Sequence, residues 1–333
     1  MRRVASAWLA RRNSARLEAD LAAMAARSGP IVAGPWLGEV GFELLYWVPF
    51  LRWCADRLDV DADRLVVMSR GGTGCWYRPF AARYVDVFDQ VSAETFRDEH
   101  DARVRALGEQ KQNRVTAFDR RLIEAAMRRA HVNDWSLLHP SRMYELLNPY
   151  WWGHQADEWV HAHVRYAKLP APPSSGIPDM PSRYFAVKFY FNDCFPATPQ
   201  NRAVVRDVLR TLAARGPVIA LSTGLNLDDH GGERVDAYGV RHLPEGIDPA
   251  RNLEVQSAVV AGAEAFVGTY GGFSYMAPFY GVKSLAIYSD PDGFSQKHLH
   301  MARSAFDAIG AGGLLDVRDT KNGVGSHLME TLS

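Results

Sequence analysis

The sequence has no excess of charge of either sign. Its 333 residues include 38 Lys plus Arg and 38 Asp plus Glu, so the formal net charge at pH 7 is +0 with His neutral. Such a chain carries no global field that attracts nucleic acid or an anionic membrane. We therefore predict no nucleic-acid partner, and we expect local groups to hold any anionic ligand.

Cysteine is scarce, and long hydrophobic runs are missing. The three cysteines, Cys54, Cys75 and Cys194, show no CxxC or zinc-like spacing, which favours a reducing compartment, free thiols and no structural metal. No stretch approaches the ~20 apolar residues of a transmembrane helix. Residues 4–10 form an apolar run too short for a signal peptide, and two arginines follow it. These absences predict a cytoplasmic protein.

Residues 1–28 are rich in arginine and alanine and have the pattern of an amphipathic helix. Its apolar face would comprise Leu9, Leu17, Leu21 and Met24. We expect this helix to pack on its own protein. The alternative is peripheral contact with the inner membrane surface, which arginines would favour. Those arginines are Arg2, Arg3, Arg11, Arg12 and Arg16.

The chain is long enough for two domains, and the first half begins with an α/β pattern. A strand is expected at 31–33, a turn and helix at 42–58, and a strand at 64–69 that is apolar on both faces, as a covered parallel sheet requires. Residues 93–163 have a charged, helical pattern. The segment 169–180 is rich in proline and serine and is typical of a linker.

After this linker, strands and helices alternate. The expected strands are 184–191, 217–222, 240–243, 265–268 and 284–288, and the expected helices are 199–215, 252–261 and 275–280. This order predicts a doubly wound α/β sheet. The whole chain is then an N-terminal helix (1–28), a Rossmann-like domain with a helical insertion (29–168), a linker (169–180) and a second Rossmann-like domain (181–333), with the two domains facing a cleft.

A glycine-rich turn within 267–278 joins a buried strand to a helix. The N–H groups at a helix N-terminus are unpaired and carry partial positive charge, so they favour an anion such as a phosphate. The predicted phosphate-binding residues are Thr269, Tyr270, Gly271, Gly272, Phe273 and Ser274. Alternatively, the turn merely connects two elements, and by itself it would suit a dehydrogenase or a kinase equally well.

Other candidate residues lie near the ends of neighbouring strands. Lys188 could neutralise a diphosphate, or it could snorkel from an edge strand. Asn192 could contact the same ligand, and the main chain of Leu243 could contact a nucleotide base. Asp228 and Asp229 are adjacent and lack the spacing of an Asp-x-Asp metal site, so we predict no metal. Further polar candidates are Thr223, Asn252 and Gln256.

Four segments form a recognisable set: 37–40 (LGEV), 48–51 (VPFL) in the following helix, 268–277 (GTYGGFSYMA) and 289–293 (SDPDG). They resemble, in this order, the Leu-Gly-Asp-Val, Leu-Pro-Ala-Leu, Asp-Thr-Gly-Leu-x-His-Leu-Ala and Gly-Pro-Thr-Asp-Pro segments of the ADP-heptose:lipopolysaccharide heptosyltransferases. This family belongs to the GT-B glycosyltransferases. The family's histidine is absent here, and residues 273–275 (FSY) stand around its position, which leaves the donor sugar open.

The resemblance implies an inverting, metal-independent transferase. It would move a sugar from a nucleoside-diphosphate donor to a glycan, glycolipid, protein or natural-product acceptor, with no cofactor beyond the donor substrate. Glu39 occupies the position of the family's general base, and Glu43 one turn later is the reserve. Glu39 could also be a helix-start carboxylate that stabilises the macrodipole. Two alternatives remain for the chain, a GT-B-like nucleotide-sugar epimerase and a non-catalytic nucleotide-sugar-binding protein.

Overall fold

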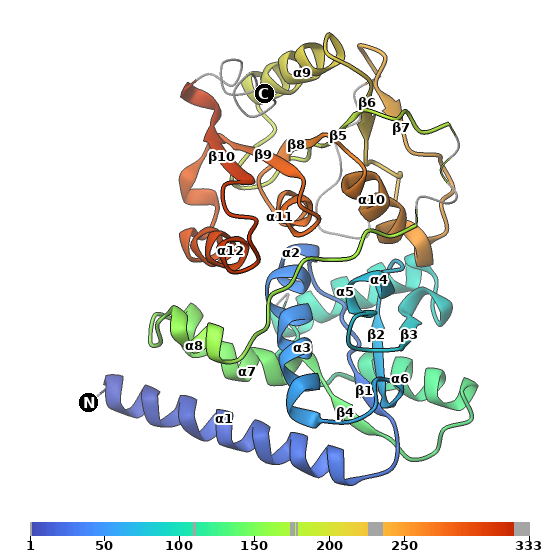
Figure 1. The fold of residues 1–333 in the computed structure, drawn as a ribbon, viewed down its shortest axis with the longest axis vertical. Helices are drawn as coiled ribbons and strands as arrows, with labels where there is room; N and C mark the ends of the chain where they lie inside the picture. Colours follow the sequence, from blue (N-terminus) through green and yellow to red (C-terminus); the bar gives the residue numbers. More distant parts are fainter. Residues whose placement is uncertain (1, 109–110, 174–176, 178, 226–235, 323–333) are drawn as a thin grey trace. The chain divides into compact units, whose positions relative to one another are not determined.

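The computed structural model describes residues 2–108, 111–173, 177, 179–225 and 236–322, and the side chains of all of these except 2–9, 107 and 322. The chain forms two compact units (Figure 1). The N-terminal unit contains Met1–Gly38 and Leu45–Arg165, and the C-terminal unit contains Glu39–Leu44 and Tyr166–Ser333. The last crossing between the units thus falls just before the predicted linker at 169–180.

The N-terminal unit is built on a parallel four-stranded sheet in the order β3-β2-β1-β4. Its strands are β1 (Ile31–Ala33), β2 (Leu65–Ser69), β3 (Arg83–Asp86) and β4 (Ser136–Leu138). Every residue of β1 and β2 is buried, as the apolar pattern on both faces predicts. The sequence analysis did not predict β3 and β4.

Helices surround this sheet. They are α1 (Arg2–Ala26), α3 (Val48–Leu58), α4 (Gly74–Tyr77), α5 (Ala93–Leu107), α6 (Ala117–Arg129), α7 (Pro140–Trp151) and α8 (Asp157–Ala162). One core cluster joins Val32, Val66 and Met68 of the strands to Phe96 of α5 and Leu122 of α6. This apolar packing places α5 and α6 beside the sheet and positions the loops at its edge.

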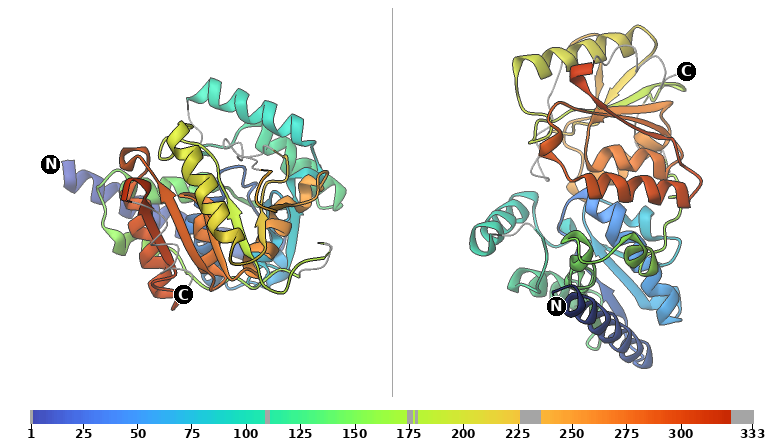
Figure 2. Two further views of the ribbon diagram at one scale, coloured as in Figure 1. Left: turned by 90° about the horizontal axis from the view of Figure 1, so that it is seen from above. Right: turned by 90° about the vertical axis from the view of Figure 1, so that its left-hand side faces the viewer.

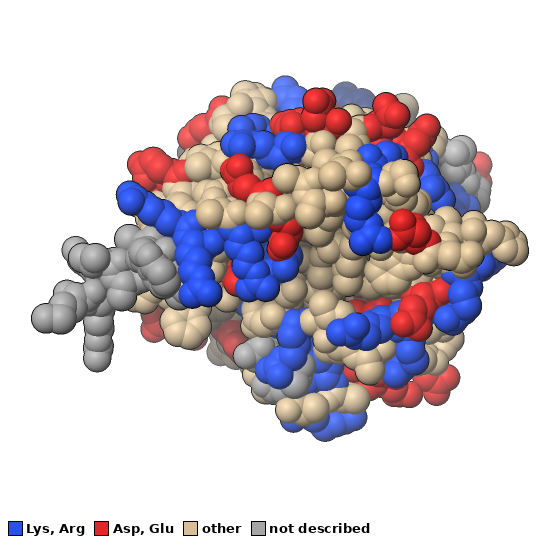
Figure 3. All heavy atoms as spheres, turned by 90° about the horizontal axis from the view of Figure 1, so that it is seen from below, with Lys and Arg blue, Asp and Glu red and all other residues tan. Residues whose placement is uncertain are grey.

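The N-terminal helix α1 packs on α3 and α7 through its buried Leu17 and Leu21. Its charged side chains form ion pairs with the same unit: Arg16 with Glu145, Glu18 with Arg57, and Asp20 with Arg142. Basic and acidic side chains are interspersed on the face shown in Figure 3. These contacts favour packing on the protein itself over attachment to a membrane surface. No helix in the described part of the chain is long and apolar enough to cross a membrane.

One helical segment connects the two units. It starts with α2 (Val40–Phe42), continues as a π-helix (Glu43–Trp47) and ends as α3. The expected helix at 42–58 is therefore confirmed, with a start two residues earlier. The boundary between the units, between Leu44 and Leu45, lies inside the π-helical turn. Such turns occur frequently at functional sites.

The C-terminal unit contains a parallel six-stranded sheet in the order β10-β9-β8-β5-β6-β7. The strands are β5 (Phe185–Lys188), β6 (Val218–Ala220), β7 (Arg241–His242), β8 (Ala265–Thr269), β9 (Lys283–Tyr288) and β10 (Leu315–Asp319). Its helices are α9 (Pro199–Ala213), α10 (Asn252–Ala261), α11 (Gly272–Phe279) and α12 (Gln296–Ala308). Helix α9 lies on one face of the sheet, and α11 and α12 lie on the other (Figures 1 and 2).

This strand order defines where a ligand would bind. The chain proceeds from β5 to β6 and β7 on one side of the sheet, then returns to place β8 and β9 on the other side. The strand order therefore reverses between β5 and β8. In open α/β sheets, ligands bind beyond the carboxyl ends of the strands at such a switch point.

The predicted α/β architecture with a sheet in each half is confirmed. Short 3-10 helices complete the structure at Ala62–Arg64, Val87–Asp89, Pro249–Arg251, Pro291–Gly293 and Thr320–Asn322.

Candidate functional site

The glycine-rich turn lies at this switch point. Strand β8 ends at Thr269 and α11 begins at Gly272, so the turn leads directly from the carboxyl end of the strand into the helix. The N–H groups of Gly272 and Phe273 belong to the first turn of α11, where an α-helix has no acceptor of its own for them. The structure therefore presents the backbone donors that a phosphate needs.

Helix α2 begins beside the start of α11 in the C-terminal unit. The segment Glu39–Leu44 packs on α11, and a Cβ added to Gly272 would lie 2.5 Å from the Gly41 nitrogen. A Cβ on Gly41 would in turn lie 2.9 Å from the Gly272 Cα. Only glycine allows two backbones to approach this closely. The start of α2 and the start of α11 are thus side by side, and their dipoles add at one point.

Several predicted side chains shape the turn instead of facing a ligand. The Ser274 hydroxyl donates to the Gly271 carbonyl at 2.7 Å and accepts from the Gly271 N–H at 3.3 Å. The Thr269 hydroxyl donates to the carbonyl of Tyr190 at 2.8 Å and accepts from its N–H at 3.1 Å. These hydrogen bonds fix the loop, and the backbone of the turn remains the surface suited to an anion.

Tyr270 is also part of the support. Its phenol contacts the Tyr275 phenol, with 2.5 Å between the two oxygens, and its ring packs on Phe294. Burial raises the pKa of Tyr270 above its usual range, although the hydrogen bond with Tyr275 acts in the opposite direction. Its side chain is 4% exposed. Tyr270 therefore holds the loop in place through its side chain.

Lys188 ends β5 and lies directly across the switch point from the turn. It is in register with Gly268 of β8. Its ammonium nitrogen donates to Gln256 Oε1 at 2.9 Å and lies 3.4 Å from the centre of the Phe273 ring. Strand β5 lies inside the sheet, so the alternative of a lysine snorkelling from an edge strand is wrong. Phe273 contributes a cation–π contact that positions the ammonium group.

A buried polar network continues from this lysine. Gln256 donates through Nε2 to Asn252 Oδ1 at 3.0 Å, and Thr223 donates to the same oxygen at 2.7 Å. Gln256, Asn252 and Thr223 are 1%, 5% and 6% exposed. The structure thus unites Lys188, Thr223 and the α10 pair of Asn252 and Gln256, and the network fixes the orientation of Gln256 toward Lys188.

The other predicted contacts have local roles. The amide oxygen of Asn192 accepts from the N–H of Phe195 at 2.9 Å, which closes its own loop. The Leu243 N–H donates to the Ala220 carbonyl at 3.4 Å as part of the sheet edge. Asp228 and Asp229 lie outside the described residues. In the part of the chain that is described, no group of three or more His, Cys, Asp or Glu side chains is arranged to hold a metal.

The two candidate bases differ sharply in exposure. Glu39 is exposed at the N-cap position of α2, where its side chain makes no capping hydrogen bond. Glu43 is 0% exposed within the π-helical turn. Both belong to the C-terminal unit, because Glu39–Leu44 packs with α11 and the Phe42 ring contacts that of His298. Glu39 is therefore carried by the same unit as the glycine-rich turn.

Two residues that the sequence analysis missed hold the loop before Glu39. Gln112 accepts from the Leu37 N–H at 2.8 Å and donates to the Pro35 carbonyl at 2.9 Å. Arg70 donates to the Gly38 carbonyl. Arg70 directly follows a buried strand and precedes glycines, which is a signal that could have identified it. Gln112 lies in a charged segment without any such signal.

Asp86 holds another glycine-rich loop, residues 70–74 (RGGTG), which follows β2. Asp86 ends β3 and accepts hydrogen bonds from the Gly72 N–H at 2.7 Å and the Tyr84 hydroxyl at 2.8 Å. Burial raises the pKa of Asp86 to about 6, despite the opposing effect of the hydrogen bonds from Gly72, Phe88, Tyr84 and Gly71. The carboxylate orders the loop at the carboxyl end of β2.

This raised pKa predicts a pH-dependent stability. Because the folded state favours the protonated form of Asp86, its contribution is favourable at low pH and is lost as the pH rises through about 6. The loss is on the order of 3 kcal/mol, at about 1.4 kcal/mol per pKa unit.

Urea unfolding of wild type and Asp86→Asn at several pH values would measure this loss of stability. The stability difference between the two should change between pH 4 and 7, whereas Asp101→Asn on the α5 surface should run parallel to wild type. Parallel curves for Asp86→Asn would contradict the assignment.

Known proteins are only weakly similar to this chain. No family model and no curated protein matches the chain. Among solved structures, a glycosyl transferase of family 9 from Veillonella parvula is similar at 12% identity and a TM-score of 0.42, over 92% of this chain and 91% of that one. The E. coli heptosyltransferase WaaC with ADP is similar at 14% identity and a TM-score of 0.42, over 90% of this chain and 99% of that one. The glycosyltransferase SnogD from Streptomyces nogalater has 10% identity and a TM-score of 0.33, over 92% and 99%.

Proposed function

We propose that this protein is a glycosyltransferase that moves a sugar from a nucleoside-diphosphate donor to an acceptor hydroxyl, with inversion and without a metal ion. One observation carries the proposal: Lys188 and the start of α11 flank the switch point between β5 and β8. A cation and unpaired backbone donors meet there at the carboxyl edge of a parallel sheet. Anionic ligands bind at such positions.

The diphosphate is the part of the donor that this arrangement fits. Negative charge grows on the diphosphate as its bond to the anomeric carbon breaks. The Lys188 ammonium and the N–H groups of Gly272 and Phe273 therefore stabilise the transition state more than the ground state. The network through Gln256 holds the ammonium in place before the reaction, so little reorganisation is needed.

Glu39 is the proposed general base. It takes the proton of the acceptor hydroxyl as that oxygen attacks the anomeric carbon, and the electron pair of the broken bond leaves with the diphosphate. Its exposure allows contact with a substrate, and the complete burial of Glu43 favours Glu39 over the reserve. The close packing of Gly41 on Gly272 keeps this carboxylate on the unit that carries the phosphate-binding turn.

The cytoplasm, with its supply of nucleotide sugars, is the proposed location. The donor class follows from the diphosphate, and the acceptor is any molecule whose hydroxyl reaches Glu39. The proposed function is tested by incubating the protein with nucleotide sugars and identifying a glycosylated product. An isomerised donor without transfer would instead favour the epimerase alternative, and an unchanged donor would favour a non-catalytic binding protein.

Replacing Lys188 by Ala should weaken nucleoside-diphosphate binding roughly 10- to 100-fold, because hydrogen bonds to charged groups contribute about 1.5–3 kcal/mol. Calorimetric titration with a nucleoside diphosphate would measure the change. Lys283→Ala is the matched control, since Lys283 is an exposed lysine at the start of β9. Equal dissociation constants for both variants would show that Lys188 does not contact the diphosphate.

A further inference from the structure

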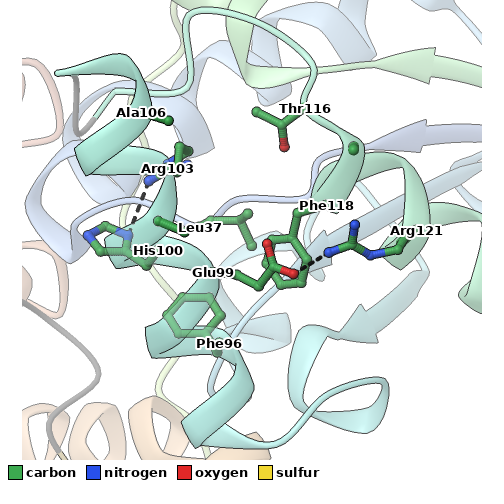
Figure 4. A pocket seen from close by; sticks show the side chains of 11 residues that line it. Leu37, Phe96, Glu99, His100, Arg103, Ala106, Thr116, Phe118 and Arg121 are labelled. Carbon is green, nitrogen blue, oxygen red and sulfur yellow. Dashed lines mark hydrogen bonds and ion pairs between the residues drawn. The ribbon is translucent and has the colours of Figure 1, made fainter.

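A pocket opens within the N-terminal unit, between α5 and the beginning of α6 (Figure 4). Its volume is about 280 Å³. Phe96 joins α5 to the core cluster, and the wall of the pocket continues from Phe96 along the same helix to Ala102 and Ala106. These two alanines are exposed and carry only methyl groups, so they leave a space that opens to solvent. The pocket is the kind of mostly apolar concavity that binds small molecules.

The apolar part of the wall is held in place by the core of the unit. Leu37 and Phe96 are 5% and 1% exposed and belong to the core cluster, and Phe118 packs against that cluster. The Phe96 ring packs edge-on against Phe88, with 5.3 Å between the ring centres. The Leu37 N–H donates to the side chain of Gln112 at 2.8 Å. The wall is therefore preformed, and a ligand does not have to order it on binding.

The polar side chains of the wall already have partners. Arg121 forms an ion pair with Glu99. Arg103 Nη2 lies 3.1 Å from His100 Nδ1, and Figure 4 draws both contacts as dashed lines. The Thr116 hydroxyl belongs to the capping box that starts α6. A charged or strongly polar ligand needs new partners when it leaves water, and these side chains could supply them only by giving up their own. An uncharged, mostly apolar ligand has no such requirement.

We infer that this pocket binds an uncharged molecule that consists of one aromatic ring with a short apolar substituent. An engineered apolar cavity of about 150 Å³ holds one benzene molecule. The present pocket, at about 280 Å³, has room for one ring and a short chain. Water is a poor occupant, because each water molecule needs 2–4 polar partners and those of this wall are engaged. An apolar ligand displaces such water and buries its own apolar surface.

The two phenylalanines favour an aromatic ligand over an aliphatic one. Phe96 and Phe118 line the pocket from α5 and α6, and aromatic rings gain additional stability in offset or edge-to-face pairs. The ligand ring lies between them, and a single hydroxyl on it stays in water at the open side, beside Ala102 and Ala106. The pocket belongs to the N-terminal unit alone, so this inference does not rest on the proposed sugar transfer.

The first test is calorimetric titration of the full chain with phenol and with 4-ethylphenol at pH 7, in the absence of any nucleotide. Both probes are uncharged at this pH, because the pKa of a phenol is about 10. We expect 4-ethylphenol to bind with a dissociation constant below about 1 mM. It should bind at least ~10-fold more tightly than phenol, since each buried CH₂ group contributes about fourfold. Equal affinities for the two probes, or no binding of 4-ethylphenol to wild type, would overturn the inference.

Three tryptophan variants of α5 test the location of the site. Ala102→Trp and Ala106→Trp each fill the pocket from its open side and should abolish binding of 4-ethylphenol. Asp101→Trp places the same ring on the same helix at an exposed position that does not line the pocket, so it should bind like wild type. Urea unfolding verifies that each variant is folded. Loss of binding in the two pocket variants but not in Asp101→Trp supports the inference, and equal binding by all three would overturn it.

Discussion

Replacing Glu39 by Gln lowers sugar transfer at least ~100-fold and leaves affinity for the nucleoside diphosphate nearly unchanged, if Glu39 is the general base. The amide cannot take the hydroxyl proton, so the attacking oxygen is no longer activated. The substitution leaves the proposed diphosphate contacts, Lys188 and the α11 backbone, unchanged. Product formation measured by mass spectrometry, with calorimetry of the nucleotide alone, separates the two effects.

The alternative role of Glu39 is that of a helix-start carboxylate, and a matched variant tests it. Glu94 is an exposed acid in the first turn of α5, so Glu94→Gln loses a comparable interaction with the macrodipole. Both substitutions should change the free energy of unfolding by about 0.3–1 kcal/mol. Only Glu39→Gln should affect transfer. Undiminished transfer in Glu39→Gln would refute its role as the base.

Replacing Gly272 by Ala should reduce nucleoside-diphosphate affinity at least ~10-fold and should destabilise the protein by roughly 1–3 kcal/mol. The new Cβ would lie 2.5 Å from the Gly41 nitrogen and 2.9 Å from the Gly41 Cα. Neither atom belongs to a side chain that can rotate away, so the starts of α2 and α11 must separate. Calorimetric titration and chemical unfolding measure the two effects.

Gly281 provides the control at the opposite end of α11. Its φ of 78° makes alanine unfavourable by about 1 kcal/mol, but a Cβ there meets no atom within 4 Å. Gly281→Ala should therefore be destabilised without losing nucleotide affinity. If both variants bind the nucleotide equally well, the close approach of Gly41 and Gly272 is not needed to form the site.

The sequence predicts the strands that are apolar and buried, and also the short β7, but it misses β3, β4 and β10. Strand β8 is buried throughout and is followed by glycines, so its position is predicted correctly, whereas α11 begins at Gly272, three residues before the expected start at 275. Only one residue of β3, Asp86, is fully buried, and β10 carries three charged residues, Asp316, Arg318 and Asp319. Strand β4 has only three residues inside a helical region. Their partners in the sheets supply what their own patterns lack.

The candidate site could be predicted only in part. The turn between β8 and α11 follows from local glycines, so it was predictable. The side-chain partners were not, because Lys188 and Gln256 are 68 positions apart and Leu37 and Gln112 are 75 apart. A single sequence does not show such contacts. Nor does it show that the Ser274 hydroxyl is used by its own turn, since a serine there suits a ligand equally well.

The measurement that tests the central claim most directly is a thermal-shift titration with ADP, GDP, UDP, CMP and the corresponding nucleotide sugars. A ligand that binds the native state at 100 times its dissociation constant stabilises it by about 2.7 kcal/mol. We predict that at least one nucleoside diphosphate raises the melting temperature of wild type, and that Lys188→Ala and Gly272→Ala reduce this shift relative to Lys283→Ala and Gly281→Ala. No shift with any nucleoside diphosphate or nucleotide sugar, or equal shifts in all four variants, would contradict a diphosphate site at the start of α11.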